Sequence, residues 1–292
     1  MLSKELLQKV KLIEISTRRT VSDVMTGQYR SSFKGHGVQF SEHRVYVPGD
    51  DIRHIDWKVS ARSSETMIKK YEEERELTLM LVVDVSGSEN FGSQKKLKSE
   101  IAAEVAGMLA FAAVQTGDKV GVLLFSGKVE KIIPPKKGRQ HVLKIITEIL
   151  TFKSRTQGTN LADALDSAGR IMKHSGIIFV ISDFIAEDYV QPLKQLVRRH
   201  DVIAVVVNDE RESQIPDVGQ LLVVDPETGA ERWIDTGSYQ FKKWFKEREM
   251  FYRSQLQSIL KNGKVEQLSV LTSSDYGDMV VKFFRSRSRK KK

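Results

Sequence analysis

The sequence predicts an α/β fold with a doubly wound, mostly parallel sheet and a small N-terminal subdomain made of a helix and β or irregular structure. Two observations carry this prediction. From residue 78 onward, short runs rich in β-branched residues alternate with segments whose apolar residues recur at helical spacing, the pattern of a parallel sheet covered by helices. The first 75 residues are instead rich in Gly, Arg and Tyr and contain the turn-like string VPGDD, which is typical of a small separate subdomain.

The predicted elements of the main domain follow one another in a regular order. The apolar run 78–85 predicts a buried strand, and a helix over 94–115 is expected to stop at Gly117. Strands over 119–126 and 128–133 are joined across Gly127, so the second is expected to be an antiparallel edge. Helices are expected over 141–152, 161–173 and 190–200, and strands over 176–182 and 201–209.

The C-terminal part continues this alternation. We expect strands over 221–225, 231–235 and 265–270, a long helix over 239–260 and a last helix ending near Phe284. The long helix carries an apolar stripe, which predicts packing in the core. The stripe consists of Phe241, Trp244, Phe245, Tyr252, Leu256 and Ile259.

Charge is distributed unevenly along the 292 residues. The formal net charge is +9, yet residues 285–292 carry six basic and no acidic groups, whereas basic and acidic groups balance over 76–284. We therefore predict an N-terminal segment over 1–75, a main domain over 76–284 and a basic tail over 285–292. The tail is expected to be solvated and mobile, and binding of nucleic acid or an anionic membrane surface is the alternative. Its basic residues are Arg285, Arg287, Arg289, Lys290, Lys291 and Lys292.

Missing residue types and motifs exclude several classes of protein. The chain has no cysteine, which excludes disulfides, thiol catalysis and thiolate zinc sites. Its apolar runs are far shorter than the roughly 20 residues that span a bilayer, and its first residues lack the apolar core of a signal peptide. We therefore predict a cytoplasmic protein. The sequence contains no Gly-x-x-x-x-Gly-Lys-Ser/Thr loop, so ATP hydrolysis by this chain is not expected.

The string GDDIRHIDW in the N-terminal segment allows two interpretations. One is a turn at Pro48 and Gly49, capped by Asp50 or Asp51, that opens a short helix and packs Ile52, Ile55 and Trp57 on the main domain. The other is a surface for a partner protein. Its residues would be Asp50, Asp51, Arg53, Asp56 and Trp57.

Oxygen-bearing side chains stand at the ends of predicted strands. Asp84, Ser86 and Ser88 end the first buried strand, Thr159 precedes a helix, and Asp183 follows the strand over 176–182. Ligands of doubly wound sheets bind beyond the carboxyl ends of the strands, where the strand order reverses. These five groups are hard oxygen donors, which suits Mg²⁺, Mn²⁺ or Ca²⁺. Two carboxylates match the charge of a divalent ion, and neutral hydroxyls leave the ion attractive to a carboxylate of a partner.

The Asp-x-Ser-x-Ser, Thr and Asp set resembles the metal-ion-dependent adhesion site of von Willebrand factor type A domains. This resemblance implies that Ser86, Ser88 and Thr159 bind the metal directly or nearly so, and that Asp84 and Asp183 act largely through water. The N-terminal segment resembles the bacterial von Willebrand-like family catalogued as domain of unknown function number fifty-eight. The resemblance rests on PGDDIRHIDWKVSAR, on EEERELTLMLVVDVSGS and on Gly27, Tyr29, Ser32, Phe33, Gly35, Gly37, Phe40, Arg44 and Tyr46. It implies a partnership with a MoxR-type AAA+ ATPase in a chaperone-like or assembly role.

We therefore predict a non-enzymatic, divalent-metal-dependent interaction module that binds an acidic protein ligand. The alternative is a metal-dependent phosphoesterase that uses Asp84 and Asp183. Aspartyl phosphatases of the haloacid dehalogenase type need a second acid two residues after the first, and Ser86 occupies that position here. A serine hydrolase is disfavoured because Ser86 lacks a Gly-x-Ser-x-Gly elbow.

Overall fold

The computed structural model describes residues 4–21, 23–33, 37–74, 76–92, 96–213, 215–224 and 229–290. They form two compact units. The larger unit contains the described residues up to Ser32 and from Leu77 onward, and the smaller unit spans Phe33–Glu76. This differs from the prediction, which placed residues 1–75 in one segment, because the two N-terminal helices pack with the larger unit.

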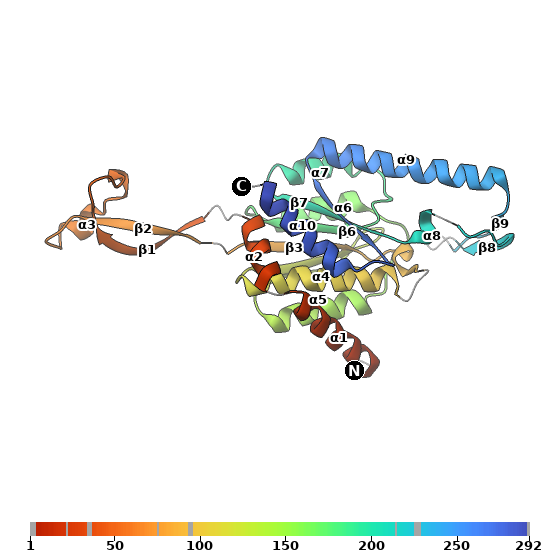
Figure 1. Cartoon of the computed structure of the whole chain (residues 1–292), viewed down its shortest axis with the longest axis horizontal. Helices are drawn as coiled ribbons and strands as arrows, with labels where there is room; N and C mark the ends of the chain where they lie inside the picture. Colours follow the sequence, from red (N-terminus) through yellow and green to blue (C-terminus); the bar gives the residue numbers. More distant parts are fainter. Residues whose placement is uncertain are drawn as a thin grey trace. The chain divides into compact units, whose positions relative to one another are not determined.

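A six-stranded sheet forms the centre of the larger unit (Figure 1), with the strand order β10-β7-β6-β3-β4-β5. The parallel strands are β3 (Thr78–Asp84), β4 (Lys119–Phe125), β6 (Ile177–Ser182), β7 (Asp201–Asn208) and β10 (Glu266–Leu271). β5 (Val129–Lys136) lies antiparallel to β4 at one edge. All of β6 and all but the first residue of β3 are buried, so both strands are almost wholly apolar. The predicted doubly wound, mostly parallel sheet is confirmed.

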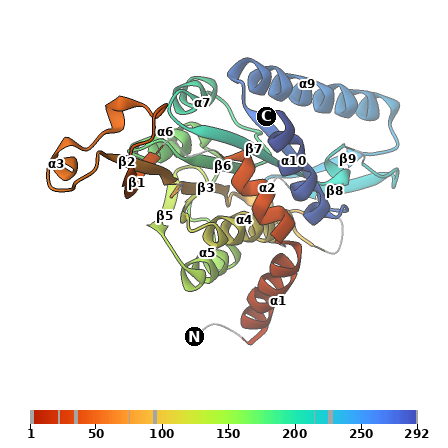
Figure 2. The same cartoon turned by 60° about the vertical axis from the view of Figure 1, so that its left-hand side comes forward.

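Helices cover both faces of this sheet (Figure 2). On one face, α4 (Lys98–Gln115) contacts α5 (Arg139–Thr151), α1 (Lys4–Thr20), α2 (Asp23–Ser32) and α10 (Tyr276–Lys290). On the other face, α6 (Leu161–Ile171) and α7 (Val190–Val197) share a hydrophobic cluster with β3, β4, β6 and β7. Most of α4 is buried, because other helices surround it, and its many alanines allow them to pack closely.

The last helix runs through most of the predicted basic tail, so the prediction of a mobile terminus is wrong for residues 285–290. Phe284 is fully buried, and its ring lies 5.7 Å from that of Tyr29 in α2. Arg287, one turn further along the same face, is 3% exposed. Its guanidinium contacts Asp201, and its Nη1 lies 2.9 Å from Glu266 Oε2. These contacts hold α10 against the edge of the sheet. The prediction for Lys291 and Lys292 lies outside the described residues.

The smaller unit is an antiparallel hairpin of β1 (Gly37–Val45) and β2 (Met67–Glu74). Between the strands lie a 3₁₀ turn, η1 (Ile52–His54), and a short helix, α3 (Trp57–Ser60). The Asp51 carboxylate caps η1, and the Asp56 carboxylate accepts hydrogen bonds from the first backbone N–H groups of α3. Ile52 and Trp57 are not buried within this unit. Ile52 is 65% exposed and Trp57 is 70% exposed.

The C-terminal strands and the long helix differ from expectation in how they pack. β8 (Gln220–Val224) and β9 (Glu231–Asp235) form a separate two-stranded sheet and do not extend the central one. α9 (Tyr239–Gly263) contacts α7 and β10, yet its predicted core stripe is partly exposed. Trp244 is 51% exposed and Tyr252 is 41% exposed, because α9 lies outside α7 and only one side of it meets the sheet domain. None of the helices in the described ranges has the length and apolar character needed to cross a membrane.

Candidate metal centre

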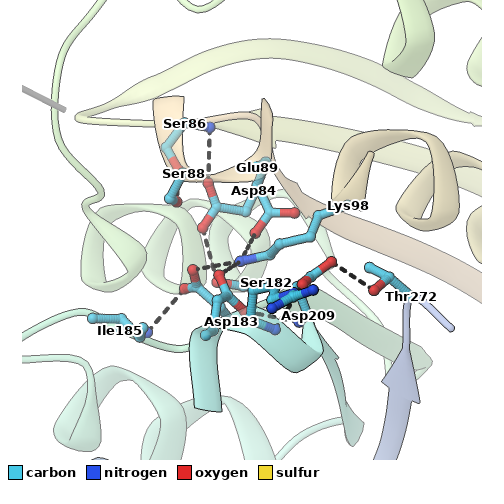
Figure 3. Close-up of polar contacts among 12 residues, drawn as sticks. Asp84, Ser86, Ser88, Glu89, Lys98, Ser182, Asp183, Ile185, Asp209 and Thr272 are labelled. Carbon is cyan, nitrogen blue, oxygen red and sulfur yellow. Dashed lines mark hydrogen bonds and ion pairs between the residues drawn. The ribbon is translucent and has the colours of Figure 1, made fainter. Parts of the chain in front are cut away.

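The candidate site lies where the strand order of the central sheet reverses. β3 and β6 are neighbours in the sheet, but the chain leaves β3 toward β4 on one side and leaves β6 toward β7 on the other. The carboxyl ends of two such strands form the crevice in which doubly wound folds bind their ligands. Asp84 is the last residue of β3, and Asp183 directly follows β6. The two carboxylates therefore meet at this point, as the sequence predicts (Figure 3).

Hydrogen bonds fix Asp84 and the loop that follows it. One carboxylate oxygen of Asp84 accepts from the backbone N–H of Ser86 at 2.9 Å, and the other accepts from the Ser182 hydroxyl at 2.8 Å. The chain then enters η2 (Gly87–Asn90). The hydroxyl oxygens of Ser86 and Ser88 lie 3.0 Å apart. Asp84 thus orients the loop that presents both hydroxyls.

The spacing of these hydroxyls fits a hexacoordinate ion. Mg²⁺ binds its ligands at about 2.1 Å in an octahedron, so two adjacent ligand oxygens lie about 3.0 Å apart. The Oγ atoms of Ser86 and Ser88 have this separation. The same separation is that of a hydrogen bond between the two hydroxyls, and it is compatible with two neighbouring ligand positions in the loop after β3.

Asp183 is held in an unusual backbone setting. Its Oδ1 accepts from the backbone N–H of Ile185 at 3.0 Å, and its Oδ2 lies 3.0 Å from Lys98 Nζ. The next residue, Phe184, has a φ of 60°, a left-handed conformation that costs a non-glycine residue about 1 kcal/mol or more. Its side chain is nevertheless buried in the core. The strain lies directly beside the candidate ligand, where functional sites tend to store it.

Thr159 comes to the same edge of the sheet on the loop before α6. The backbone N–H of the next residue, Asn160, donates to the carbonyl oxygen of Ser126 at 2.7 Å. Ser126 directly follows β4, the neighbour of β3. Four of the five predicted ligands lie at the ends of β3 and β6, where hydrogen bonds and ion pairs hold them. They are Asp84, Ser86, Ser88 and Asp183. Thr159 stands in the adjoining loop and is partly exposed.

Sequence reasoning missed three charged residues of the site. Glu89 in η2 is 1% exposed, and ligand oxygens of Asp84, Glu89 and Asp183 all lie within 4.8 Å of one another. Lys98, the first residue of α4, is fully buried, with Nζ 2.9 Å from Glu212 Oε1 and 3.6 Å from Glu89 Oε1. Glu212 lies in α8 (Glu210–Ser213), just after β7. The burial of Lys98 could have been predicted from helical periodicity. Lys98 lies three residues before Ile101 and seven before Val105, so it shares the apolar face of the predicted helix with them.

The electrostatics of the site follow from burial and crowding of these groups. Burial, followed by the charge of Asp183, raises the pKa of Asp84 to about 6. Burial also raises the pKa of Glu89 well above its usual value. Burial acts to lower the pKa of Lys98, but Glu89, Asp183 and Glu212 together outweigh it and raise that pKa. The three carboxyl groups around Lys98 therefore favour the charged form of its ammonium, while burial favours the neutral form of Glu89.

The donor set suits a hard divalent cation. Every candidate ligand offers oxygen, which favours Mg²⁺, Mn²⁺ or Ca²⁺ over softer metals. Within the described residues, Glu89 Oε1 is buried and has no hydrogen-bond partner, since Lys98 Nζ is too distant for one. The charge of this oxygen is compensated by the Lys98 ammonium at 3.6 Å, so the fit to a divalent ion rests on the oxygen donors Asp84, Ser86, Ser88 and Asp183. The residues present therefore fit a divalent ion.

Comparison with known proteins identifies the family of this chain. Residues 42–255 match the family described as "Protein of unknown function DUF58". The chain belongs to this family. An uncharacterized protein of Mycobacterium bovis is 29% identical to it over 288 residues, which cover 98% of this chain and 90% of the relative. YeaD of Bacillus subtilis is 34% identical over 106 residues, which cover 36% of this chain and 24% of YeaD.

Solved structures share the fold at low identity. An aerotolerance-related membrane protein from Bacteroides fragilis aligns with a TM-score of 0.51 at 18% identity, over 73% of this chain and 99% of that chain. The VWA domain of SpRpn10 aligns with a TM-score of 0.42 at 9% identity, over 70% and 93% of the two chains. The sheet order and the likeness to the Bacteroides fragilis protein confirm the predicted doubly wound α/β fold.

The same comparison corrects the predicted location. We predicted a cytoplasmic protein from the absence of long apolar runs and of the apolar core of a signal peptide. A protein of this fold is described as a membrane protein, so the prediction is wrong as an inference from these features. The reason is physical: the short apolar runs reflect how this domain packs its core, and they do not record where the domain is located.

The two remaining predicted surfaces occupy different parts of the structure. In the hairpin of the smaller unit, Asp50 pairs with Arg44 at 2.6 Å and Asp51 pairs with Arg53 at 2.7 Å. Asp56 pairs with His43 and Lys69 at 3.1 and 3.3 Å. Each of these three acids is therefore paired with a basic group inside the hairpin. In α10, Arg285, Arg289 and Lys290 are exposed, while Arg287 is buried.

Proposed function

We propose that the protein is a non-enzymatic, divalent-metal-dependent protein interaction module. The observation that carries this proposal is the pair of Ser86 and Ser88 hydroxyls at ligand spacing, beside two buried carboxylates at the reversal point of the sheet. In this proposal Ser86, Ser88 and Thr159 hold Mg²⁺ or Mn²⁺, and Asp84 and Asp183 anchor them. A bound ion would supply an open position for a carboxylate of a partner protein.

The burial of the carboxylates supports binding over hydrolysis. Asp84 is 2% exposed, and both of its oxygens already accept hydrogen bonds. A carboxylate nucleophile must reach the phosphorus atom it attacks, and this one is turned into the protein. The fold itself does not decide between binding and hydrolysis, because proteins with the same fold have many different activities.

We further propose a MoxR-type AAA+ ATPase as the partner, acting with this protein in a chaperone-like or assembly role. The family resemblance supports this choice. The hairpin of the smaller unit offers a contact surface, since Ile52 and Trp57 are exposed there. An interaction through the basic tail is less favoured because the buried guanidinium of Arg287 is already paired.

Metal binding is tested by thermal unfolding of the full chain with Mg²⁺ or Mn²⁺. At a metal concentration 100 times Kd, binding to the native state adds about 2.7 kcal/mol, which raises Tm by roughly 5 °C for a protein of this size. We expect this rise for the wild type and for Ser167→Ala, a serine of α6 bonded to Arg170. The rise should be lost in Ser86→Ala/Ser88→Ala. Equal rises in all three proteins would refute the site.

The hairpin surface is tested by replacing Trp57 with alanine. Because the indole is 70% exposed, we expect the free energy of unfolding to change by less than about 0.5 kcal/mol. Exposed aromatic side chains often dominate binding, so capture of a purified MoxR-type ATPase should fall at least tenfold. Undiminished capture would remove the hairpin from the proposed interface while leaving the metal site untouched.

A further inference from the structure

Lys98 places an ammonium group inside the acidic crevice. Its side chain is fully buried, and Nζ lies 2.9 Å from Glu212, 3.0 Å from Asp183 and 3.6 Å from Glu89. The ammonium therefore lies among three carboxylates that come from the segments after β3, β6 and β7, and Figure 3 shows Lys98 beside Glu89 and Asp183.

This placement differs from the usual behaviour of lysine. A lysine at a helix end normally extends its flexible stem to bring the ammonium into water, and burying the charge is costly unless several partners compensate it. Lys96, only two residues earlier, behaves in the usual way: its side chain is 42% exposed, and its Nζ pairs with Glu104 at 2.8 Å. Lys98 is therefore held in the crevice by its carboxylate partners.

The crevice has a metal side and a lysine side that share Asp183. On the metal side lie Asp84 and the paired hydroxyls of Ser86 and Ser88. On the lysine side lie Glu89 and Glu212, and the backbone N–H of Asp209 fixes the Glu212 carboxylate at 2.9 Å. One divalent ion balances two carboxylates, so the crowded acids on the lysine side need a second positive charge.

We propose that Lys98 is a built-in second cation of the metal centre. Its ammonium takes the position among Glu89, Asp183 and Glu212 that a second metal ion would otherwise fill. The proposal rests on the metal site proposed above and states its composition: one divalent ion, next to one fixed ammonium. Many hydrolytic sites use two metal ions to activate and stabilise the reacting oxygens. A centre with one exchangeable ion keeps the binding position for a partner carboxylate but lacks the second Lewis acid.

The test is the number of Mn²⁺ ions bound per chain, measured by isothermal titration and by electron paramagnetic resonance of bound Mn²⁺. We expect one ion for the wild type and one for the control Lys96→Met. For Lys98→Met we expect two, with a spectrum broadened by the neighbouring spin. One ion or none in Lys98→Met, with one in the wild type, would overturn the role of Lys98. No ion in the wild type would instead refute the proposed function.

A second variant keeps the test decisive if Lys98→Met does not fold without metal. Lys98→Met/Glu212→Gln removes the ammonium and one of its partners, so the net charge of the crevice is unchanged. Because one carboxylate is removed together with the ammonium, this variant should fold without metal and bind one Mn²⁺ ion, and Lys98→Met refolded from denaturant in saturating Mn²⁺ should regain the native circular dichroism spectrum and bind two. Failure of both variants to fold in Mn²⁺ would also overturn the proposal, because a metal ion that can replace the ammonium would restore the fold.

Discussion

Replacing Arg287 with methionine is expected to lower the free energy of unfolding by about 2–3 kcal/mol. Arg287 is 3% exposed and contacts Asp201 and Glu266. Removing one member of a fully buried ion pair costs roughly 3–5 kcal/mol. The side chains of Asp201 and Glu266 are about one-third exposed, so water compensates part of the loss.

The measurement is the urea midpoint, followed by circular dichroism. The matched control is Arg289→Met, two residues further along α10, where the guanidinium is exposed. We expect the free energy of unfolding of this control to lie within about 0.5 kcal/mol of the wild-type value. If both variants shift the midpoint equally, the effect comes from the general charge of the segment and not from the docking of α10.

The contrast between Arg287 and Arg289 shows that a local sequence pattern does not reveal which basic side chains are buried by contacts with distant parts of the chain. The run of basic residues after Phe284 is typical of a solvated tail. The docking of this segment depends on Asp201 at the start of β7 and Glu266 at the start of β10. Both lie far away in the chain, so no local pattern reveals them. The same holds for Lys98, whose partners come from three different loops.

The parts predicted correctly are those whose signal is local. Strands β3 and β6 are buried on both faces, and this produces continuous apolar runs that mark them in the sequence. Because ligands gather at strand ends in this fold class, Asp84 and Asp183 were found together with the strands. Glu89 was missed because an acid in a tight turn is usually a cap, and its burial follows only from the packing of the crevice.

The long helix shows a different limit. Its aromatic stripe was correctly located in sequence, but periodicity does not say whether a stripe meets the same chain or is left exposed. Arg248 lies over the ring of Trp244 at 5.2 Å and over that of Tyr252 at 5.6 Å. Arg248 therefore makes cation–π contacts with these exposed aromatics without burying them.

Replacing Gly127 with alanine is expected to disturb the metal centre from a distance. A Cβ at this position would lie 2.2 Å from the backbone oxygen of Gln157. The clash is with backbone, so the loop that carries Thr159 must move. That loop is otherwise bound tightly, because the Glu130 carboxylate accepts from the backbone N–H of Thr156 at 3.0 Å and from its hydroxyl at 2.7 Å. We expect a stability loss of about 1–3 kcal/mol and a Kd for Mn²⁺ raised at least tenfold.

The control for this prediction is Gly27→Ala in α2. No atom lies within 4 Å of the added Cβ there, and alanine favours a helix over glycine by up to about 1 kcal/mol. This variant should be as stable as the wild type or slightly more stable, with an unchanged Kd for Mn²⁺. If Gly127→Ala lowers stability but leaves the Kd unchanged, Thr159 is not a ligand, and the ion is held by the residues after β3 and β6 alone. A change in both quantities is expected because the same backbone contact that excludes a Cβ at Gly127 fixes the position of the Thr159 loop.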